Sequence, residues 1–405
     1  MSLSVTAAFA TSIVLYGLVS ARLTRWNVTA PMVFLVLGLV LANGPTGFLE
    51  VHLGSEGIAL IAEIVLAVVL FGDAAGIRLG DLRRDAGLPA RLLLIGLPIT
   101  MALGTLAAHL LLPGLSWWVC AVIGAAVAPT DAALGSAIVS DRRIPLRVRR
   151  LLNVESGLND GIATPFVNLF IVAAVAGTAL QRESNGRALL GLAGGVVAGI
   201  VIGGGGAWLM HRADLAGLAT RSQRSVGVAA LALLAYAGTV VLHGNGFVAA
   251  FVAGLVYGAV KARSRDDDSA EVPPDPHDSL ELTHELGSLG SMIVWFLVGA
   301  VLVPTLADLT AGEAVFAVLA LTIVRMGPVA LSLLGAGLDR ATIAVVGWFG
   351  PRGLASVVFA LLALEGLGDE VGLRAVRVIT ATVALSVILH GVTAGPVAAR
   401  QRPAD

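Results

Sequence analysis

The chain contains about thirteen continuous apolar stretches, each close to the length that crosses a lipid bilayer. A bilayer core of roughly 30 Å requires about 20 apolar residues in a helix. The strands of an outer-membrane barrel would instead alternate apolar and polar residues. We therefore predict an all-α polytopic membrane protein with about 13 transmembrane helices, forming a single membrane domain over residues 1–405. The expected spans are 3–21, 29–47, 56–74, 91–112, 116–139, 148–177, 187–210, 224–242, 245–261, 281–303, 312–334, 340–364 and 373–395.

The overall composition excludes several other classes of protein. Hydrophobic residues make up 57% of the chain and charged residues 13%, whereas about a quarter of the residues in soluble domains are charged. No stretch remains for a soluble domain, and a disordered chain is excluded by the same apolar excess. A net charge of -1 argues against nucleic-acid binding. The lone cysteine, Cys120, rules out an intramolecular disulfide.

Basic residues are distributed unequally between the two sides of the predicted bundle. When the connections are assigned alternately to the two sides, twenty of the 26 Lys and Arg residues fall on one side and four on the other. Because Lys and Arg are enriched in cytoplasmic loops, we expect a multi-pass protein of the inner (plasma) membrane with its N-terminus outside and its C-terminus in the cytoplasm.

Arg22 and Arg25 follow the first apolar stretch and no basic residue precedes it, so we expect a retained helix rather than a signal peptide.

Two of the predicted helices contain sequences that interrupt a helix. Pro129–Asp131 places a proline, a hydroxyl and a carboxylate in the fifth span, and Gly350–Gly353 places Gly-Pro-Arg-Gly in the twelfth. Such breaks are tolerated within a membrane where they line a site, and paired breaks are typical of transporters with inverted repeats. We predict crossed discontinuous helices within two inverted six-helix repeats, residues 3–177 and 224–395, joined by a linking helix over 187–210. The alternative is that both breaks are packing kinks.

A few charged side chains fall inside the predicted spans. Each costs at least about 2.5–3.5 kcal/mol near a helix centre, so such residues usually mark an ion path. The candidates are Glu63, Asp131, Glu155, Asp160, Arg325 and Arg352.

The sixth span offers a set of oxygen ligands at helical spacing. Ser156 and Asp160 are four residues apart and share one helix face. Together with Thr130 and Asp131 they would form an oxygen-only site, which suits a hard cation such as Na+ rather than a transition metal. No cofactor is expected. Burial disfavours the charged form of the Asp160 carboxylate, so a proton and a cation should compete for it.

The remaining membrane-embedded charges have structural interpretations. We expect Glu155 to form a structural ion pair with Arg325 or Arg352, and the alternative for Asp160 is a permanent pair with one of the same arginines. Glu63 either belongs to a proton path or pairs with an arginine.

A four-residue glycine repeat in the seventh span suggests close helix packing. Gly191, Gly195, Gly199 and Gly203 form a stripe of small residues that lets another backbone approach closely. We favour packing within the chain over a dimer face. The polar stretch 262–279 is expected to be a solvated linker.

These motifs resemble the monovalent cation:proton antiporter-1 family, the bacterial and archaeal sodium/proton exchangers. Pro129–Asp131 is similar to the family's Thr-Asp break, Glu155–Gly161 to its Asn-Asp motif, and Gly350–Gly353 to its second crossing helix. The resemblance implies a thirteen-helix homodimer with a mobile core domain. It also implies that Asp160 is the carboxylate that binds the cation and the proton.

The resemblance assigns roles to the neighbouring side chains as well. Thr130, Ser156 and Asp131 would help to coordinate the cation, and Asn159 would mark the electroneutral branch, because electrogenic relatives carry Asp at that position. The predicted function is therefore electroneutral exchange of Na+ for a proton, with Li+ and K+ as further candidate cations.

Two other functions are less consistent with the sequence. A proton- or sodium-coupled symporter of a small organic anion would need basic groups at its site, and only Arg325 and Arg352 are available. A membrane-embedded enzyme is disfavoured because the chain lacks the HExxH, GxSxG and phosphate-loop motifs. We therefore predict a transporter rather than an enzyme.

Overall fold

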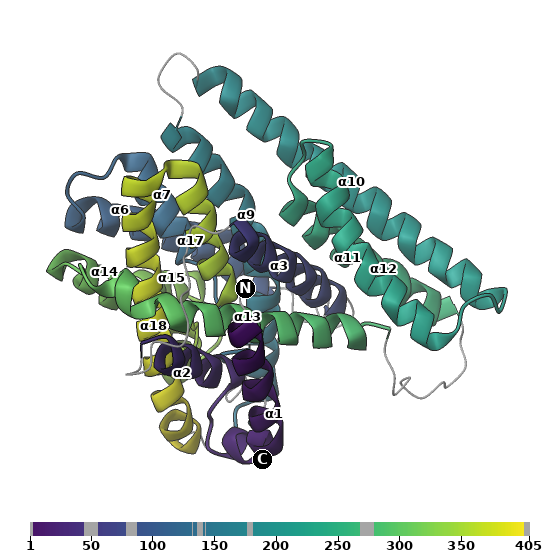
Figure 1. Ribbon diagram of the computed structural model, residues 1–405, viewed down its shortest axis with the longest axis horizontal. Helices are drawn as coiled ribbons and strands as arrows, with labels where there is room; N and C mark the ends of the chain where they lie inside the picture. Colours follow the sequence, from purple (N-terminus) through teal and green to yellow (C-terminus); the bar gives the residue numbers. More distant parts are fainter. Residues whose placement is uncertain are drawn as a thin grey trace. The chain divides into compact units, whose positions relative to one another are not determined.

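The computed structural model describes residues 3–43, 56–77, 87–131, 133–135, 141, 143–175, 181–267 and 279–400. Within these ranges the regular structure is entirely helical, which confirms the predicted fold class (Figure 1). The helices are α1 Leu3–Arg25, α2 Ala30–Asn43, α3 Glu56–Gly76, α5 Gly87–Arg91, η1 Leu92–Gly96, α6 Leu97–Leu111, α7 Trp117–Ala126, α9 Leu146–Val175, α10 Gln181–Leu215, α11 Arg221–Val241, α12 Gly246–Asp267, α13 Glu281–Leu306, α14 Ala311–Leu321, α15 Ile323–Ser332, α16 Arg340–Trp348, α17 Leu354–Leu367 and α18 Asp369–Arg400.

Nine helices of the described part are long and apolar enough to cross a membrane, and four shorter apolar helices accompany them. Residues 44–47 of the second predicted span, the far end of the fifth span and most of the expected linker 262–279 lie outside the described residues. The predicted fourth span consists of α5, η1 and α6 in succession, with η1 forming one turn of π-helix. The eleventh is divided at Thr322, between α14 and α15.

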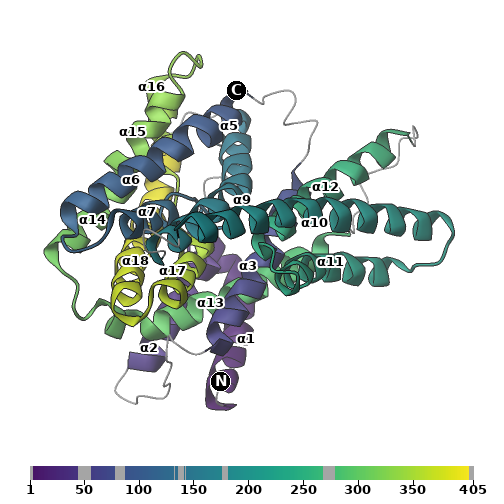
Figure 2. The ribbon, with the colours of Figure 1, turned by 90° about the horizontal axis from the view of Figure 1, so that it is seen from above.

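The first of two compact units comprises residues 1–59, 87–175 and 291–405. Close backbone approaches at glycines hold parts of it together. A methyl group on Gly38 of α2 would collide with the Phe296 carbonyl of α13, and one on Gly124 of α7 would lie 2.5 Å from the Thr105 backbone nitrogen of α6. Helices α17 and α18 lie side by side in Figures 1 and 2. This unit contains both interrupted helices.

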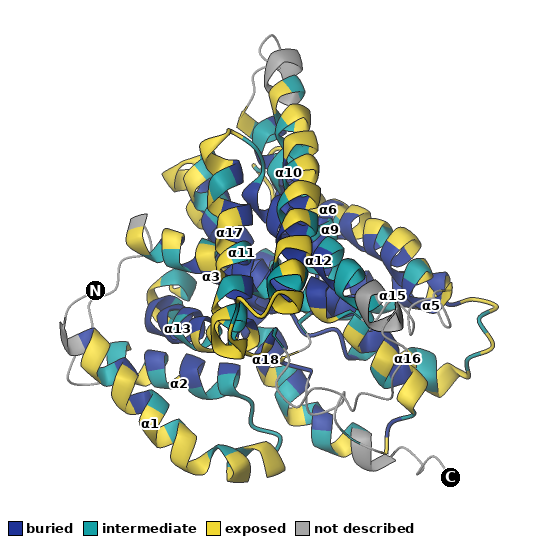
Figure 3. Ribbon diagram, turned by 90° about the vertical axis from the view of Figure 1, so that its right-hand side faces the viewer, coloured by how far each residue is buried: buried dark blue, intermediate teal, exposed yellow. Residues whose placement is uncertain are grey.

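The second unit comprises residues 60–86 and 176–290. Here α10 packs along α12 through the predicted glycine stripe: a methyl group on Gly195 would lie 2.6 Å from the Asn245 carbonyl, and one on Gly199 would lie 2.7 Å from the Ala249 carbonyl. The stripe therefore serves packing within the chain. Apolar residues such as Val197 and Val201, on the other side of α10, are exposed. Figure 3 shows exposed residues along this helix, as expected of a helix that faces lipid.

Candidate ion-binding site at two interrupted helices

The first interruption follows α7. This helix begins at its N-cap Ser116 and ends at Ala126, and Ala128–Asp131 has no helical conformation. Pro129 lacks a backbone N–H and clashes with the carbonyl one turn earlier, which explains why the helix stops here. The second interruption is Phe349–Gly353, between α16 and α17. Both breaks occur where the sequence predicts them.

The two interruptions meet in space. The backbone nitrogen of Asp131 donates to the Pro351 carbonyl at 2.7 Å. The glycines of the second break make room for the first: a methyl group on Gly353 would collide with the Asp131 side chain, and one on Gly350 would lie 2.8 Å from the Thr130 side chain. The unwound segments therefore cross in direct contact.

Asp131 caps a helix that follows the other break. Its Oδ2 accepts a hydrogen bond from the Leu354 nitrogen at 3.1 Å, at the positive N-terminus of α17. Its Oδ1 accepts from the nitrogens of Ala133 at 2.7 Å and Leu134 at 3.3 Å. A carboxylate is stabilising near a helix N-terminus. Asp131, in the first interruption, therefore accepts a hydrogen bond from the N-terminus of α17, which follows the second interruption.

Arg352 makes the reciprocal contact. Its Nη1 donates to the carbonyls of Ala128 at 2.6 Å and Pro129 at 3.0 Å, just beyond the C-terminal end of α7. Its Nη2 donates to the Ala320 carbonyl at 3.2 Å. A cation is favourable at a helix C-terminus, and the freed carbonyls of the break require donors. Each interruption thus supplies the charge that the other one needs.

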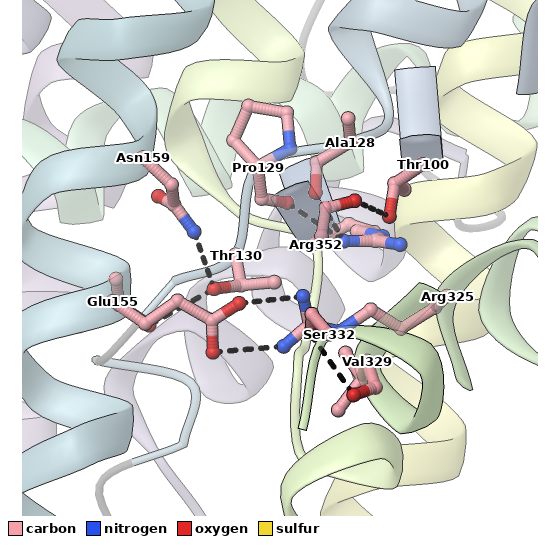
Figure 4. Close-up of polar contacts among 12 residues, drawn as sticks. Thr100, Ala128, Pro129, Thr130, Glu155, Asn159, Arg325, Val329, Ser332 and Arg352 are labelled. Atoms are coloured by element: carbon pink, nitrogen blue, oxygen red, sulfur yellow. Dashed lines mark hydrogen bonds and ion pairs between the residues drawn. The ribbon is translucent and has the colours of Figure 1, made fainter. Parts of the chain in front are cut away.

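A buried cluster of oxygen atoms lies beside the first interruption (Figure 4). The hydroxyls of Thr130 and Ser156 are 3.0 Å apart, and Nδ2 of Asn159 donates to Thr130 Oγ1 at 2.7 Å. The Oδ1 atom of Asn159 is buried without a hydrogen-bond partner. A buried acceptor of this kind is costly unless a ligand satisfies it. Asp160 follows on the same helix, one turn after Ser156, and is partly exposed.

Glu155 is neutralised by an arginine. The two Nη atoms of Arg325 donate to its two carboxylate oxygens at 2.6 and 2.9 Å, and both side chains are 3% exposed (Figure 4). A buried, bidentate pair is a strong, directional interaction. Of the two arginines that the sequence offers as partners, the structure pairs Arg325 with Glu155 and uses Arg352 at the breaks.

The structure thus brings together Thr130, Ser156 and Asn159, with Asp160 on the same helix face as Ser156. Glu63 lies in the second unit, where Oη of Tyr236 donates to its carboxylate at 2.5 Å. Sequence reasoning missed Tyr236, and also Ser386 of α18, whose hydroxyl accepts from the Arg352 backbone nitrogen at 2.7 Å. Neither residue belongs to a motif, so only the fold reveals these contacts.

A family model described as "Sodium/hydrogen exchanger, transmembrane" matches residues 9–400. The chain belongs to the sodium/hydrogen exchanger family. This membership confirms the resemblance drawn from the Thr-Asp, Asn-Asp and Gly-Pro-Arg-Gly motifs.

Curated relatives of this exchanger-family chain include transporters of two cations. The K(+)/H(+) antiporter NhaP2 of Shewanella oneidensis is 26% identical over 250 residues, which are 61% of this chain and 42% of the relative. The Na(+)/H(+) antiporter 2 of Zygosaccharomyces rouxii is 41% identical over 63 residues, 15% of this chain and 8% of the relative. The chain therefore spans less than half the length of these curated relatives.

The fold of the exchanger-family chain is also similar to a solved structure. The sodium proton antiporter MjNhaP1 of Methanocaldococcus jannaschii at pH 8 aligns with a TM-score of 0.73 over 98% of this chain and 99% of that chain, at 21% identity. At this identity the likeness establishes the fold alone. The candidate site is identified from the contacts described above.

Proposed function

We propose that the chain exchanges a monovalent cation for a proton at Asp160, next to the cluster of Thr130, Ser156 and Asn159. The observation that carries this proposal is the buried oxygen cluster at the crossing of two interrupted helices. The atoms available to bind a cation there are hydroxyl and amide oxygens, which suit a hard cation. Unwound backbone within a membrane-spanning unit is tolerated where it lines such a site.

The exchange cycle follows from the charges around the cluster. Arg325 neutralises Glu155, so Glu155 is not required to bind the transported ion. Asp160 then supplies the negative charge that either a cation or a proton neutralises. Only the neutralised forms would cross between the outward- and inward-facing states, because moving an uncompensated carboxylate through a low-dielectric barrier is costly. This restriction couples the two ions.

We assign Asp131 an indirect role at the same site, because it lies where the two interrupted helices cross. Both of its carboxylate oxygens accept backbone hydrogen bonds, so it acts on the cation site chiefly by fixing the position of Thr130, its neighbour in the chain. The prediction from sequence, that Asp131 also coordinates the cation, remains a prediction.

The proposed stoichiometry is one cation for one proton. Asn159 contributes a neutral amide, so Asp160 is the single titrating carboxylate assigned to the oxygen cluster. One positive charge in each direction makes exchange electroneutral. An organic-anion symporter is less well supported, because the terminal nitrogens of Arg325 and Arg352 already bind Glu155 and the backbone carbonyls.

We extend the proposal to the whole molecule on the basis of the basic-residue distribution and the family resemblance. The chain would form a homodimer in the plasma membrane with a cytoplasmic C-terminus, and residues 3–177 and 224–395 would be inverted repeats. The contact between Asp131 and Pro351 supports a pairing of corresponding helices from the two repeats.

Ion exchange in proteoliposomes tests the proposal. An imposed pH gradient should dissipate when Na+, Li+ or K+ is added, and the initial rates should rank the cations. The rate should be the same with the membrane voltage clamped at zero and at a negative value. A rate that follows the voltage would contradict electroneutral exchange, and no dissipation with any of the three cations would contradict the function.

A further inference from the structure

His390 on α18 is a buried titratable side chain that the proposed cycle does not use. It is 3% exposed and lies against the C-terminal end of α16. Its Nε2 is 2.8 Å from the Trp348 carbonyl, and its Nδ1 is 2.8 Å from the Ser386 carbonyl and 3.0 Å from the Ser386 hydroxyl. Both ring nitrogens therefore face hydrogen-bond acceptors.

This arrangement can satisfy the ring in two protonation states. A neutral imidazole has one N–H; it can donate from Nε2 to Trp348 while Nδ1 accepts from the Ser386 hydroxyl. A protonated ring has two N–H groups and can donate to both carbonyls. The Ser386 hydroxyl would then turn toward a carbonyl one helical turn earlier, as helical serines often do. Heavy atoms need not move between the two states.

The surroundings of the ring contain contributions of both signs. The Trp348 carbonyl belongs to the last turn of α16, where a cation is favourable. The Trp348 ring lies 5.3 Å from the imidazole, and an aromatic ring within about 6 Å attracts a cation over its face. Removal from water opposes a charge on any buried side chain, and the positive charges of Arg352 and Arg325 act on the ring. Neither protonation state is favoured by all of these influences.

The other elements packed against α18 contribute few further charges near His390. Helices α2 and α7 carry no acidic or basic residues. Glu313 of α14 pairs with Arg374 and Arg377, at least 13 residues away along α18. Glu365 lies near the end of α17 that is remote from the break. Arg340 begins α16, at the end remote from Trp348. Among the charged side chains that the structure describes, Arg352 and Arg325 act on the imidazole.

One hydrogen bond links this ring to the crossing of the broken helices. The Ser386 hydroxyl, which contacts His390 Nδ1, also accepts from the backbone nitrogen of Arg352, the residue whose side chain holds the carbonyls of the first break. Asp131 and Arg352 satisfy two of the helix ends at the breaks. At the end of α16 the compensating group is one that can gain or lose a proton.

We propose that His390 is a second proton-binding site, separate from Asp160, and that its protonation sets the pH range in which the crossed helices support exchange. One proton is taken up at Nδ1, and the hydrogen bond from Arg352 to Ser386 is kept. The first part concerns His390 alone. The second part, the effect on exchange, rests on the proposed function.

Nuclear magnetic resonance of the full chain in detergent, labelled with ¹³C at the histidine Cε1 position, tests the first part. The chain has seven histidines, and the signal absent from H390Q identifies His390. We expect this signal to titrate as the pH is lowered from neutral over the range in which the protein stays folded. S386A should raise the midpoint, because it removes the hydroxyl that donates to the neutral ring and leaves the carbonyl that accepts from the protonated one. A signal that does not titrate, or an unchanged midpoint in S386A, would overturn the proposed switch.

The pH profile of exchange in proteoliposomes tests the second part. H390Q should shift the pH of half-maximal exchange by about half a unit or more. The control is H109Q, which removes an exposed histidine that packs against Trp117 and should leave the profile unchanged. Identical profiles for H390Q and the unaltered chain would overturn the link to exchange. If the unaltered chain shows no exchange, the proposed function fails, and the titration still decides whether His390 binds a proton.

Discussion

Glu155 and Asp160 are five residues apart on α9, yet their surroundings differ. Glu155 is held by two charge-assisted hydrogen bonds from Arg325. Asp160 is partly exposed and follows, at one helical turn, the Ser156 hydroxyl that belongs to the oxygen cluster. The two carboxylates should therefore respond differently to neutralisation: one should affect stability and the other transport.

Glu155→Gln should destabilise the protein. It leaves the Arg325 guanidinium buried without a counter-charge, and breaking a buried pair in this way typically costs about 3–5 kcal/mol. Thermal unfolding in detergent should show a clear drop in the midpoint temperature. An unchanged midpoint would show that Arg325 does not depend on Glu155.

The control for that variant is Arg143→Ala, which breaks the exposed pair with Asp141 and should have little effect. The hydrogen bond from Arg143 holds the pKa of the Asp141 carboxyl below its ordinary value. The stabilisation from this shift is present above the ordinary pKa and is lost as the pH falls through the lowered one. At neutral pH it is therefore constant, and the comparison with Glu155→Gln is unaffected by small changes in pH.

Ser156→Ala should weaken cation binding with little loss of stability. It removes one hydroxyl from the cluster, worth about 1 kcal/mol, and should raise the apparent KM for the cation about 3- to 10-fold. Thr100→Val is a matched control, because the Thr100 hydroxyl is also buried but bonds to a carbonyl of its own helical segment. Equal KM values for the two variants would contradict the assignment of Ser156 as a ligand of the cation.

The two interrupted helices act as a pair at the scale of elements. Each break leaves helix ends that must be compensated within a unit that spans the membrane. Asp131 compensates the start of α17, and Arg352 compensates the end of α7. Since each of these residues lies in the other break, the geometry of the site depends on both helices at once.

Gly353→Ala should therefore disrupt the site. The added methyl group would occupy the position of the Asp131 side chain, so the carboxylate would have to leave the start of α17. Exchange should fall strongly and the midpoint of thermal unfolding should drop. Gly327→Ala is the control, because nothing lies within 4 Å of the added methyl group in α15, and this exchange of Gly for Ala inside a helix should be neutral or slightly stabilising. Normal exchange by Gly353→Ala would contradict the described crossing.

The sequence allows the helices and the breaks to be predicted, because apolar length and the positions of Pro129 and Pro351 act locally. It does not reveal which groups satisfy the breaks. Asp131 and Leu354 are 223 residues apart, and the partners Tyr236, Ser386 and His390 lie in ordinary helical sequences. Contacts of this kind depend on how helices pack, which local patterns do not encode. The choice between Arg325 and Arg352 for Glu155 was open for the same reason.

For the whole molecule, the proposed exchange predicts competition between two ions. If the proton and the cation neutralise the same carboxylate, as proposed, each weakens the binding of the other. The apparent KM for the cation should therefore rise as the pH falls, by up to about tenfold per pH unit, the limit for one competing proton. Initial rates over a range of pH and cation concentration measure this dependence. A KM that is independent of pH would indicate separate sites.

The decisive measurement for the shared carboxylate is exchange by Asp160→Asn in proteoliposomes. Glu63→Gln is the matched control, since it also neutralises a carboxylate on an apolar helix, in the second unit, where Tyr236 hydrogen-bonds to it. Asp160→Asn should fold but abolish cation-dependent dissipation of a pH gradient, whereas Glu63→Gln should retain it. Normal exchange by Asp160→Asn would contradict the assignment of the shared site.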